Sequence, residues 1–167
     1  VSLPATATLT VNTLPNADIT PSGSTTFCMG NSVTLTAPSG IGLNYSWQKN
    51  TSSIAGQTAI SYITSQSRDF TVTVTDGNGC TNTTSPATQV TVNPLPTFIT
   101  SSTPLEDGLG NINICNGSIA VLSSTITSGL SPYTYQWFDS AGAISSATNA
   151  NYSAPTTSDY KLKVTDK

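Results

Sequence analysis

The feature that most constrains the fold of this chain is a strand-and-turn pattern that occurs twice. Phe70, Val72 and Val74 alternate with threonines, which is the period-two pattern of a strand with one buried face. The turn residues at 76–79 follow at once, and their sequence Asp-Gly-Asn-Gly favours a tight hairpin. The strand pattern returns at residues 159–166. Recurrence of one β unit predicts a tandem arrangement of similar domains.

Other landmarks of this unit also occur in pairs. Trp47 and Trp137 lie 90 positions apart, and each follows a tyrosine. The sequence Leu-Thr-Val-Asn-Thr-Leu-Pro at 9–15 matches Val-Thr-Val-Asn-Pro-Leu-Pro at 90–96. Paired motifs in the same order indicate that the repeat covers nearly the whole chain.

The paired motifs predict where the domains begin and end. Residues 14–94 are expected to form one complete immunoglobulin-like repeat. Residues 95–167 are expected to form a second repeat that lacks its last strand, and residues 1–13 to be the terminal strand of a preceding repeat or a donor strand. Leu-Pro pairs at the junctions restrict the backbone, which favours an extended rod.

The composition predicts an all-β fold. Glu106 is the only glutamate, and Pro and Gly separate short runs rich in Val, Thr and Ile. Strands that recur every 8–15 residues or so, with turn residues between them, are typical of a two-sheet sandwich. In the complete repeat, strands are expected at 32–37, 45–48, 58–63, 69–75 and 87–92.

Aromatic residues at matched positions are expected to form the core of each repeat. Trp47 and Phe70 have the inward parity in the first repeat, and Trp137 and Tyr160 have it in the second. Each repeat is short, so its core is expected to be thin.

Three cysteines offer one disulfide within a repeat. Cys28 and Cys80 fall in the same repeat, and oxidising conditions would let them pair. Cys115 is then left unpaired in this segment. Its partner is expected a few residues beyond Lys167, although a reactive or intermolecular thiol is the alternative.

A strand-borne Trp followed by a later Asp-x-aromatic strand resembles the immunoglobulin-like fold. In that fold a tyrosine near this strand donates a hydrogen bond to the backbone upstream, which Tyr160 could do and Phe70 could not. Cys28 and Cys80 depart from the antibody pattern, because they flank their strands and would link one end of the sandwich.

A fuller resemblance rests on four motifs: Cys-x-Gly-x-Ser-Val-x-Leu at 28–35, Tyr-x-Trp at 45–47, Phe-Thr-Val-Thr-Val-Thr-Asp-Gly-Asn-Gly-Cys at 70–80, and Val-Thr-Val-Asn-Pro-Leu-Pro at 90–96. Together they resemble the Ig-like or PKD-like repeats of large surface proteins of Bacteroidota, which include gliding-motility adhesins exported by the type IX secretion system. The resemblance implies a secreted, extracellular or cell-surface location and a role in cell adhesion. Its partners would be neighbouring repeats of the same or an identical chain, and surface glycans or a substratum.

Composition and residue types argue against several other classes of function. The net charge is −3 and charged residues make up 8%, so no basic surface for nucleic acid is expected. No apolar run is long enough for a membrane helix. The chain has no histidine, which excludes Ser-His-Asp catalysis and His-type zinc sites. We therefore expect no enzyme activity, no cofactor and no metal site, with calcium between repeats near Asp18, Asp76 or Asp107 as an open alternative.

A few residues are candidates for surface contacts. Tyr133 and Phe138 have no aromatic counterpart in the first repeat, so they are the better candidates for glycan contact. Asp139-Ser140-Ala141 resembles the O-glycosylation signal of Bacteroidota, which makes Ser140 a candidate acceptor.

The leading hypothesis is a structural and adhesive segment of a long surface or filament protein. A first alternative is a subunit that polymerises by donating residues 3–12 to the open sandwich of its neighbour. A second alternative is a carbohydrate-binding accessory module of a secreted enzyme.

Overall fold

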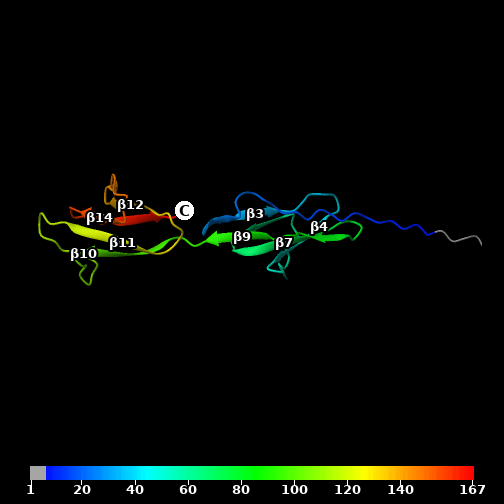
Figure 1. The fold of residues 1–167 in the computed structure, drawn as a ribbon, viewed down its shortest axis with the longest axis horizontal. Coiled ribbons are helices and arrows are strands. Elements are labelled where there is room, and N and C mark those ends of the chain that lie inside the picture. The colour runs from blue at the N-terminus through cyan, green and yellow to red at the C-terminus, as the bar shows by residue number, and fades with distance from the viewer. Residues whose placement is uncertain (1–6) are drawn as a thin grey trace, which may run out of the picture. The chain divides into compact units, whose positions relative to one another are not determined.

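The structure is a computed structural model that describes residues 7–167, and this range contains strands and turns without a helix. The chain divides into two compact units, with the division between Val92 and Asn93. We call the parts before and after this division unit 1 and unit 2. Each unit is built from two sheets, whose strand pairs with a described register are antiparallel (Figure 1). The prediction of an all-β, tandem immunoglobulin-like sandwich is therefore confirmed, whereas the extended rod stays a prediction.

The first sheet of unit 1 has three strands. Alternation of Val and Leu with Thr gives β3 one buried face, because successive side chains of a strand point to opposite sides. β3 pairs antiparallel with a strand on each side. The order is β1 (Thr20–Pro21), β3 (Val33–Thr36) and β6 (Ser61–Thr64).

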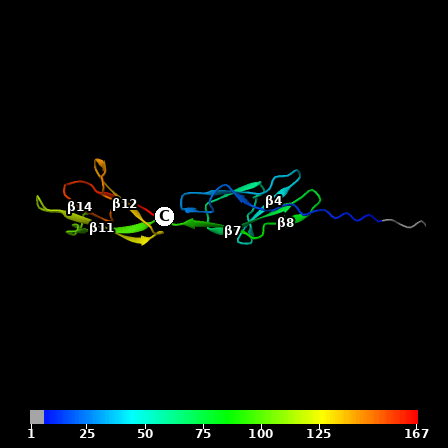
Figure 2. The same ribbon diagram turned by 45° about the horizontal axis from the view of Figure 1, so that its top comes forward.

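The second sheet of unit 1 is larger and carries the aromatic residues. Its longest strand is β7, in which Phe70, Val72 and Val74 are all buried, as their alternation predicts. A hairpin at 76–79 joins β7 to a short strand, β8 (Thr81–Thr83). The order of the other strands is β2 (Thr26–Cys28), β9 (Thr88–Asn93), β7 (Arg68–Thr75), β4 (Asn44–Lys49) and β5 (Ser52–Ser53). Figure 2 labels β4, β7 and β8 of this sheet.

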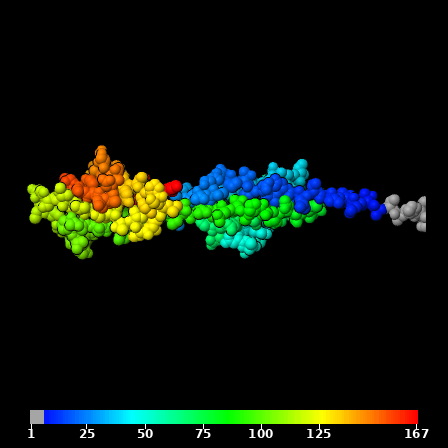
Figure 3. All heavy atoms as spheres, viewed as in Figure 1, coloured from blue at the N-terminus to red at the C-terminus, as the bar shows by residue number. Residues whose placement is uncertain are grey.

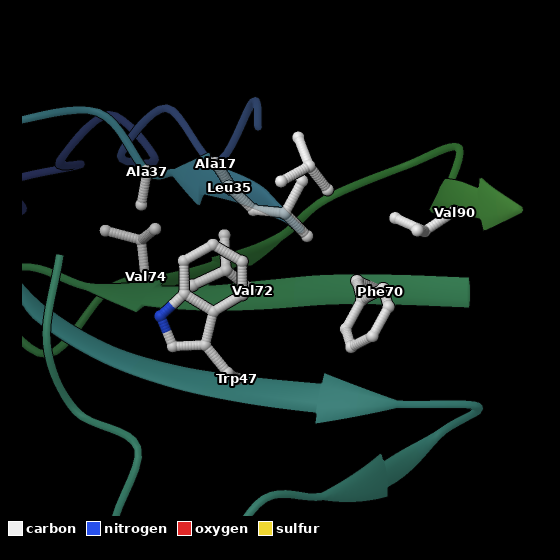
Figure 4. Packing of buried hydrophobic residues seen from close by; sticks show 9 residues of the cluster. Ala17, Leu35, Ala37, Trp47, Phe70, Val72, Val74 and Val90 are labelled. Atoms are coloured by element: carbon white, nitrogen blue, oxygen red, sulfur yellow. The ribbon is translucent and has the colours of Figure 1, made fainter. Parts of the chain in front are cut away.

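The core of unit 1 lies between these two sheets. Trp47 and Phe70 rise from β4 and β7 toward Leu35, which comes from the opposite sheet (Figure 4). Val90 brings β9 into the same cluster and is only 1% exposed. Both sheets thus contribute side chains to one continuous apolar cluster, and β9 closes it along one edge.

Unit 2 repeats most of this plan. One sheet has the order β10 (Thr97–Thr103), β11 (Ala120–Ser128) and β14 (Asn151–Ala154). The other has the order β13 (Gly142–Ala143), β12 (Thr134–Asp139) and β15 (Lys161–Thr165). β12 pairs with β15 as β4 pairs with β7, so that Trp137 faces Leu162 where Trp47 faces Val72. Unit 2 therefore contains counterparts of every long strand of unit 1 except β9.

The aromatic clusters of the two units have the same distances between ring centroids. In unit 1, ring centroids are 5.9 Å apart for Trp47 and Tyr62 and 5.6 Å apart for Tyr62 and Phe70. In unit 2, the distances are 5.9 Å for Trp137 and Tyr152 and 5.6 Å for Tyr152 and Tyr160. These separations are typical of favourable aromatic pairs.

The two indole groups are also held in the same way. The indole Nε1 of Trp47 donates a hydrogen bond to the Ala59 carbonyl at 2.9 Å. That of Trp137 donates to the Asn149 carbonyl at the same distance. The repeat seen in the sequence is thus a repeat of three-dimensional packing.

The first described residues of unit 1 differ from its strands. Residues 7–13 form no strand, and Leu9 and Val11 are 88% and 84% exposed. Figure 3 shows this part of the chain as a narrow extension. Residues 1–6 of the expected terminal strand lie outside the described residues, and the assignment of 1–13 to a preceding repeat stays a prediction.

Candidate functional site

The candidate site lies in unit 2, and the place of β9 in unit 1 explains it. β9 lies between β2 and β7. It pairs with the first residues of β7, with Thr88 opposite Phe70 and Val90 opposite Arg68. On its other side, Thr91 N donates a hydrogen bond of 2.8 Å to the Thr25 carbonyl, just before β2. β9 therefore provides backbone hydrogen-bond partners for two neighbouring segments, the start of β7 and the residues just before β2.

Unit 2 has counterparts of both neighbours but not of the strand between them. Residues 113–115 correspond to β2, since Ile114 and Cys115 follow the same order as Phe27 and Cys28. Unlike β2, residues 113–115 form no strand. Residues 158–160 correspond to the start of β7, yet β15 begins only at Lys161. Both segments lose regular pairing where the counterpart of β9 is missing.

A cavity of about 1060 Å³ lies between these two segments, and we call it the open groove. Residues 113–115 and 158–160 belong to its lining. Its apolar lining is contributed by both sheets and comprises Phe98, Ile112, Ile114, Leu122, Trp137, Tyr160 and Leu162. In unit 1 the corresponding space is filled, because Val90 covers the core next to Phe70 (Figure 4).

Tyr160 is fixed at the floor of the open groove. Its hydroxyl donates a hydrogen bond of 2.8 Å to the Thr156 carbonyl, and it lies 3.2 Å from the Thr156 hydroxyl oxygen. This bond to the backbone four residues upstream is the one that the immunoglobulin-like resemblance implies for Tyr160. Phe70 has no hydroxyl and is fully buried instead, beneath β9.

The chemistry of the open groove suits an extended peptide. A strand edge without a neighbour presents backbone N–H and C=O groups that another strand can pair with. The apolar floor can take every second side chain of such a strand. The lining contains no histidine, because the chain has none. The unpaired backbone and the apolar floor are thus the two features of the open groove that could contact an extended peptide.

The expected disulfide between Cys28 and Cys80 is wrong, because both cysteines are free in the structure. Cys28 ends β2, which belongs to the edge near the start of β7. Cys80 lies past the other end of β7, where its carbonyl accepts a 3.0 Å hydrogen bond from Asp76 N. The length of β7 separates the two by on the order of 20 Å, at about 3.3 Å per residue. A disulfide requires Cα atoms within about 7 Å.

Cys115 is also free, and it is exposed at the open groove. The sequence reasoning missed the importance of its neighbour Ile114. The signal was present, because alignment of Cys115 with Cys28 places Ile114 at the position of Phe27, which packs against the core of unit 1.

The acidic residues form turns. Asp76 and Asp107 begin two turns of the same geometry, each with a glycine three residues later at φ 83°. The Asp107 carboxylate accepts hydrogen bonds from Asn111 N at 2.9 Å and Leu109 N at 3.0 Å. These N–H donors hold the pKa of Asp107 below its ordinary value of 3.8. Among residues 7–167 no group of three metal-ligating side chains gathers, and no helix could span a membrane.

The candidate surface residues lie around β12. Tyr133 and Phe138 are half-buried, and Phe138 has the opposite parity to the buried Trp137. Ser140 is exposed in the tight connection between β12 and β13. The hydroxyl of Ser158 donates a hydrogen bond of 3.2 Å to Ser140 Oγ, so Ser140 lies beside the open groove. Glycan contact and glycosylation at these residues stay predictions.

No family model matches the chain, and no curated protein matches it. Among solved structures, a segment of three immunoglobulin domains of titin, in an E-to-A mutated variant, is similar with a TM-score of 0.49 and 10% identity; the match covers 90% of this chain and 60% of the titin chain. A chimeric titin tandem functionalised with a GRGDS peptide from fibronectin has a TM-score of 0.35 and 19% identity, over 89% of this chain and 92% of that one. The fold described above rests on the strand order of each unit.

Proposed function

We propose that this chain is a structural and adhesive segment of a long secreted cell-surface or filament protein, without catalytic activity. The observation that carries the proposal is that the same sandwich occurs twice, with matched aromatic clusters around Trp47 and Trp137. Repetition of one small unit is typical of proteins that span distance or present many weak binding sites.

The surface chemistry supports a role outside the cell. Only 8% of the residues are charged, so Thr, Ser and Asn supply most of the polar surface. The resemblance to Bacteroidota surface repeats makes a gliding-motility type of adhesin, exported by the type IX system, the specific form of this proposal. Its partners are neighbouring repeats and glycans or a solid substratum, and many copies would give strength through avidity.

The test uses antibodies raised against the folded chain. We expect them to label the surface of intact source cells, and to recover a parent protein whose intact mass far exceeds the 17.2 kDa of this sequence. Beads coated with the parent protein should adhere to glass or to glycan-coated surfaces, and beads coated with a matched globular protein should not. A parent confined to the cell interior, or one of 17.2 kDa without further repeats, would contradict the proposal.

A second candidate function is a filament subunit that assembles by strand donation. The open groove of unit 2 favours it, because an apolar groove beside an unpaired strand edge can accept an added strand.

A further inference from the structure

β10 is the edge strand of its sheet in unit 2, and its outer edge has no partner strand among residues 7–167. It pairs with β11 alone, along its whole length (Figure 1). In unit 1 the corresponding strand, β1, is also an edge strand, because β9 joins the other sheet. The free edge of β10 therefore follows from the strand order of the sandwich and not from the open groove.

The two edge strands can be aligned residue by residue. Pro21 pairs with Leu35 in β3, and Ser102 pairs with Leu122 in β11. Leu35 and Leu122 are equivalent, because each also pairs with the tyrosine of its own aromatic cluster. Pro21 and Ser102 therefore occupy the same place in the two units.

The two edges differ in the features that keep strands apart. Unit 1 has Asp18 and Pro21 here, and a charged residue and a proline are two common means of preventing edge strands from pairing. The nitrogen of Pro21 faces away from β3, since the next residue, Ser22, donates a 2.8 Å hydrogen bond to a β3 carbonyl. Unit 2 has Ile99 and Ser102 at these places, and Ile99 is 62% exposed. The edge of unit 2 thus lacks both protective residues.

The sheet to which β10 belongs carries no charged side chain. β10, β11 and β14 consist of the sequences TFITSST, AVLSSTITS and NYSA. A strand without charge does not repel its own copy, and it has no electrostatic preference for a partner of opposite charge. The chemistry of this edge therefore suits a second copy of the same strand.

The backbone groups at the outer edge can be assigned from the hydrogen bonds of β11. Ser124 N donates a 3.1 Å hydrogen bond to the Ala150 carbonyl, so the backbone of Ser124 faces β14. Successive residues of an antiparallel strand face alternate sides, so the next residue of β11 faces β10 and bonds with its partner, Ile99. By the same alternation, Phe98 and Thr100 direct their N–H and C=O groups away from β11.

We propose that two copies of this chain form a dimer by pairing their β10 strands antiparallel, with a two-fold axis at Ile99. Phe98 of each copy then exchanges backbone hydrogen bonds with Thr100 of the other. The two Ile99 residues lie directly opposite each other as a non-hydrogen-bonded pair, in which Cα atoms are about 4.5 Å apart. At the same place, unit 1 would bring two Asp18 carboxylates together, which is unfavourable.

The pairing joins the two three-stranded sheets of the two copies into one continuous sheet. The same surface is used on both sides, so the contact closes at a dimer. It therefore differs from strand donation, which fills the open groove of one copy with a segment of another. Within a long surface protein, such a contact would join two parent chains side by side and raise the number of binding sites presented together.

The first experiment measures the mass of the full chain by analytical ultracentrifugation over a wide range of concentration. We expect a monomer–dimer equilibrium that salt does not weaken, because no ion pair contributes to it. Ile99→Asp gives β10 the residue of unit 1 and should raise the dissociation constant at least about tenfold. Its matched control is Ile63→Asp, on β6, because Ile63 is 65% exposed on a strand of unit 1. This control should dimerise as the wild type does.

A second variant removes a hydrogen bond instead of adding a charge. Thr100→Pro deletes an N–H group that β11 does not use, and proline is tolerated on an edge strand when its nitrogen faces outward. This variant should also raise the dissociation constant at least about tenfold. A circular dichroism spectrum like that of the wild type shows that each variant is folded.

Cross-linking tests the register of the pairing. In a chain that carries Cys115→Ser, Ile99→Cys should form a covalent dimer on mild oxidation, because Cα atoms about 4.5 Å apart lie within the range of a disulfide. Ser101→Cys is the control, since Ser101 is also exposed on β10. In the proposed register its two copies lie on the order of 13 Å apart along the strands, at about 3.3 Å per residue. The chain with Cys115→Ser alone gives the background from the other two cysteines.

Three results would overturn the proposal. The first is a wild-type chain that stays monomeric at every concentration. The second is an association that Ile99→Asp and Thr100→Pro leave unchanged, which would assign it to another surface such as the open groove. The third is cross-linking that is equally efficient at positions 99 and 101.

Discussion

Unit 1 and unit 2 have the same aromatic cluster but differ in how it is closed. In unit 1, Phe70 is fully buried, and Val90 on β9 is 1% exposed beside it. In unit 2, Tyr160 takes the place of Phe70 and lines the open groove. The ring distances agree although only one unit has β9. The comparison teaches that the aromatic cluster packs in the same way with or without β9, and that β9 excludes solvent from one edge of the core in unit 1.

The aromatic residue at this edge of the core differs between the units, with Phe70 next to β9 in unit 1 and Tyr160 at the open groove in unit 2. Phe70, which pairs with β9, is fully buried, and its side chain has no polar group that needs a hydrogen-bond partner. Beside the open groove, a tyrosine donates its hydroxyl proton to the Thr156 carbonyl. A buried hydroxyl needs a partner, whereas one at an open edge can reach the backbone or water. The ring at each edge thus has the polar group that its surroundings can satisfy.

The largest effect is expected from removing the two matched rings. Phe70→Ala should lower the free energy of unfolding of unit 1 by about 3–5 kcal/mol, because it leaves a cavity in a sealed core. Tyr160→Ala should cost unit 2 about 1–3 kcal/mol, since the ring is already half-exposed. Denaturation followed by NMR of the two indole N–H signals, one from each unit, measures both. Equal losses in the two units would contradict the comparison.

A smaller effect is expected from weakening the seal itself. Val90→Ala should lower the stability of unit 1 by about 2 kcal/mol through lost burial and a small cavity. The control is Val121→Ala in β11 of unit 2, where the side chain is 37% exposed. That change should cost no more than about 0.5 kcal/mol. Similar losses in the two variants would show that β9 does not seal the core.

The turn that begins at Asp107 gives unit 2 a small dependence on acid. The N–H groups of Asn111 and Leu109 hold the pKa of Asp107 below 3.8 in the folded state. Its contribution to stability is therefore fully present above pH 3.8 and is lost as the pH falls through the lower pKa of the folded state. Asp107→Asn should remove this part of the pH dependence, and Glu106→Gln should leave it in place. NMR titration of the carboxyl carbon of Asp107 is the direct measurement; a midpoint at or above 3.8 would contradict the assignment.

The smallest effect on the fold is expected at the candidate glycan contacts. Tyr133→Ala and Phe138→Ala should leave the unfolding midpoint of unit 2 nearly unchanged, because both side chains are only half-buried. If these residues bind glycan, each change should reduce binding on a glycan array by about tenfold through lost ring stacking. Unchanged binding in both variants would remove this role from unit 2.

Much of the sandwich could be predicted from periodicity and spacing. The alternation around Val72 placed β7, and the 90-residue spacing of Trp47 and Trp137 placed β4 and β12. Such patterns work because a strand with one buried face must alternate, whatever surrounds it. The turn at 76–79 was predictable for the same local reason, since its glycines permit positive φ.

The disulfide and the groove could not be predicted in the same way. Pairing of Cys28 with Cys80 depends on which end of the sandwich each occupies, and the strand order that decides this is not local in sequence. The missing last strand could be inferred from the repeat, but the lining of the open groove could not. Ile114 and Tyr160 come from segments far apart in the chain, and only the packed structure brings them to one cavity.

The most direct test of the account is residue-level hydrogen exchange of the full chain. The account predicts strong protection of the Arg68 and Phe70 amides, which β9 covers, and rapid exchange at Ser158 and Tyr160, where no strand pairs. Equal protection of the two edges would contradict the claim that β9 covers this edge in unit 1 and that no strand among residues 93–167 covers the matching edge in unit 2.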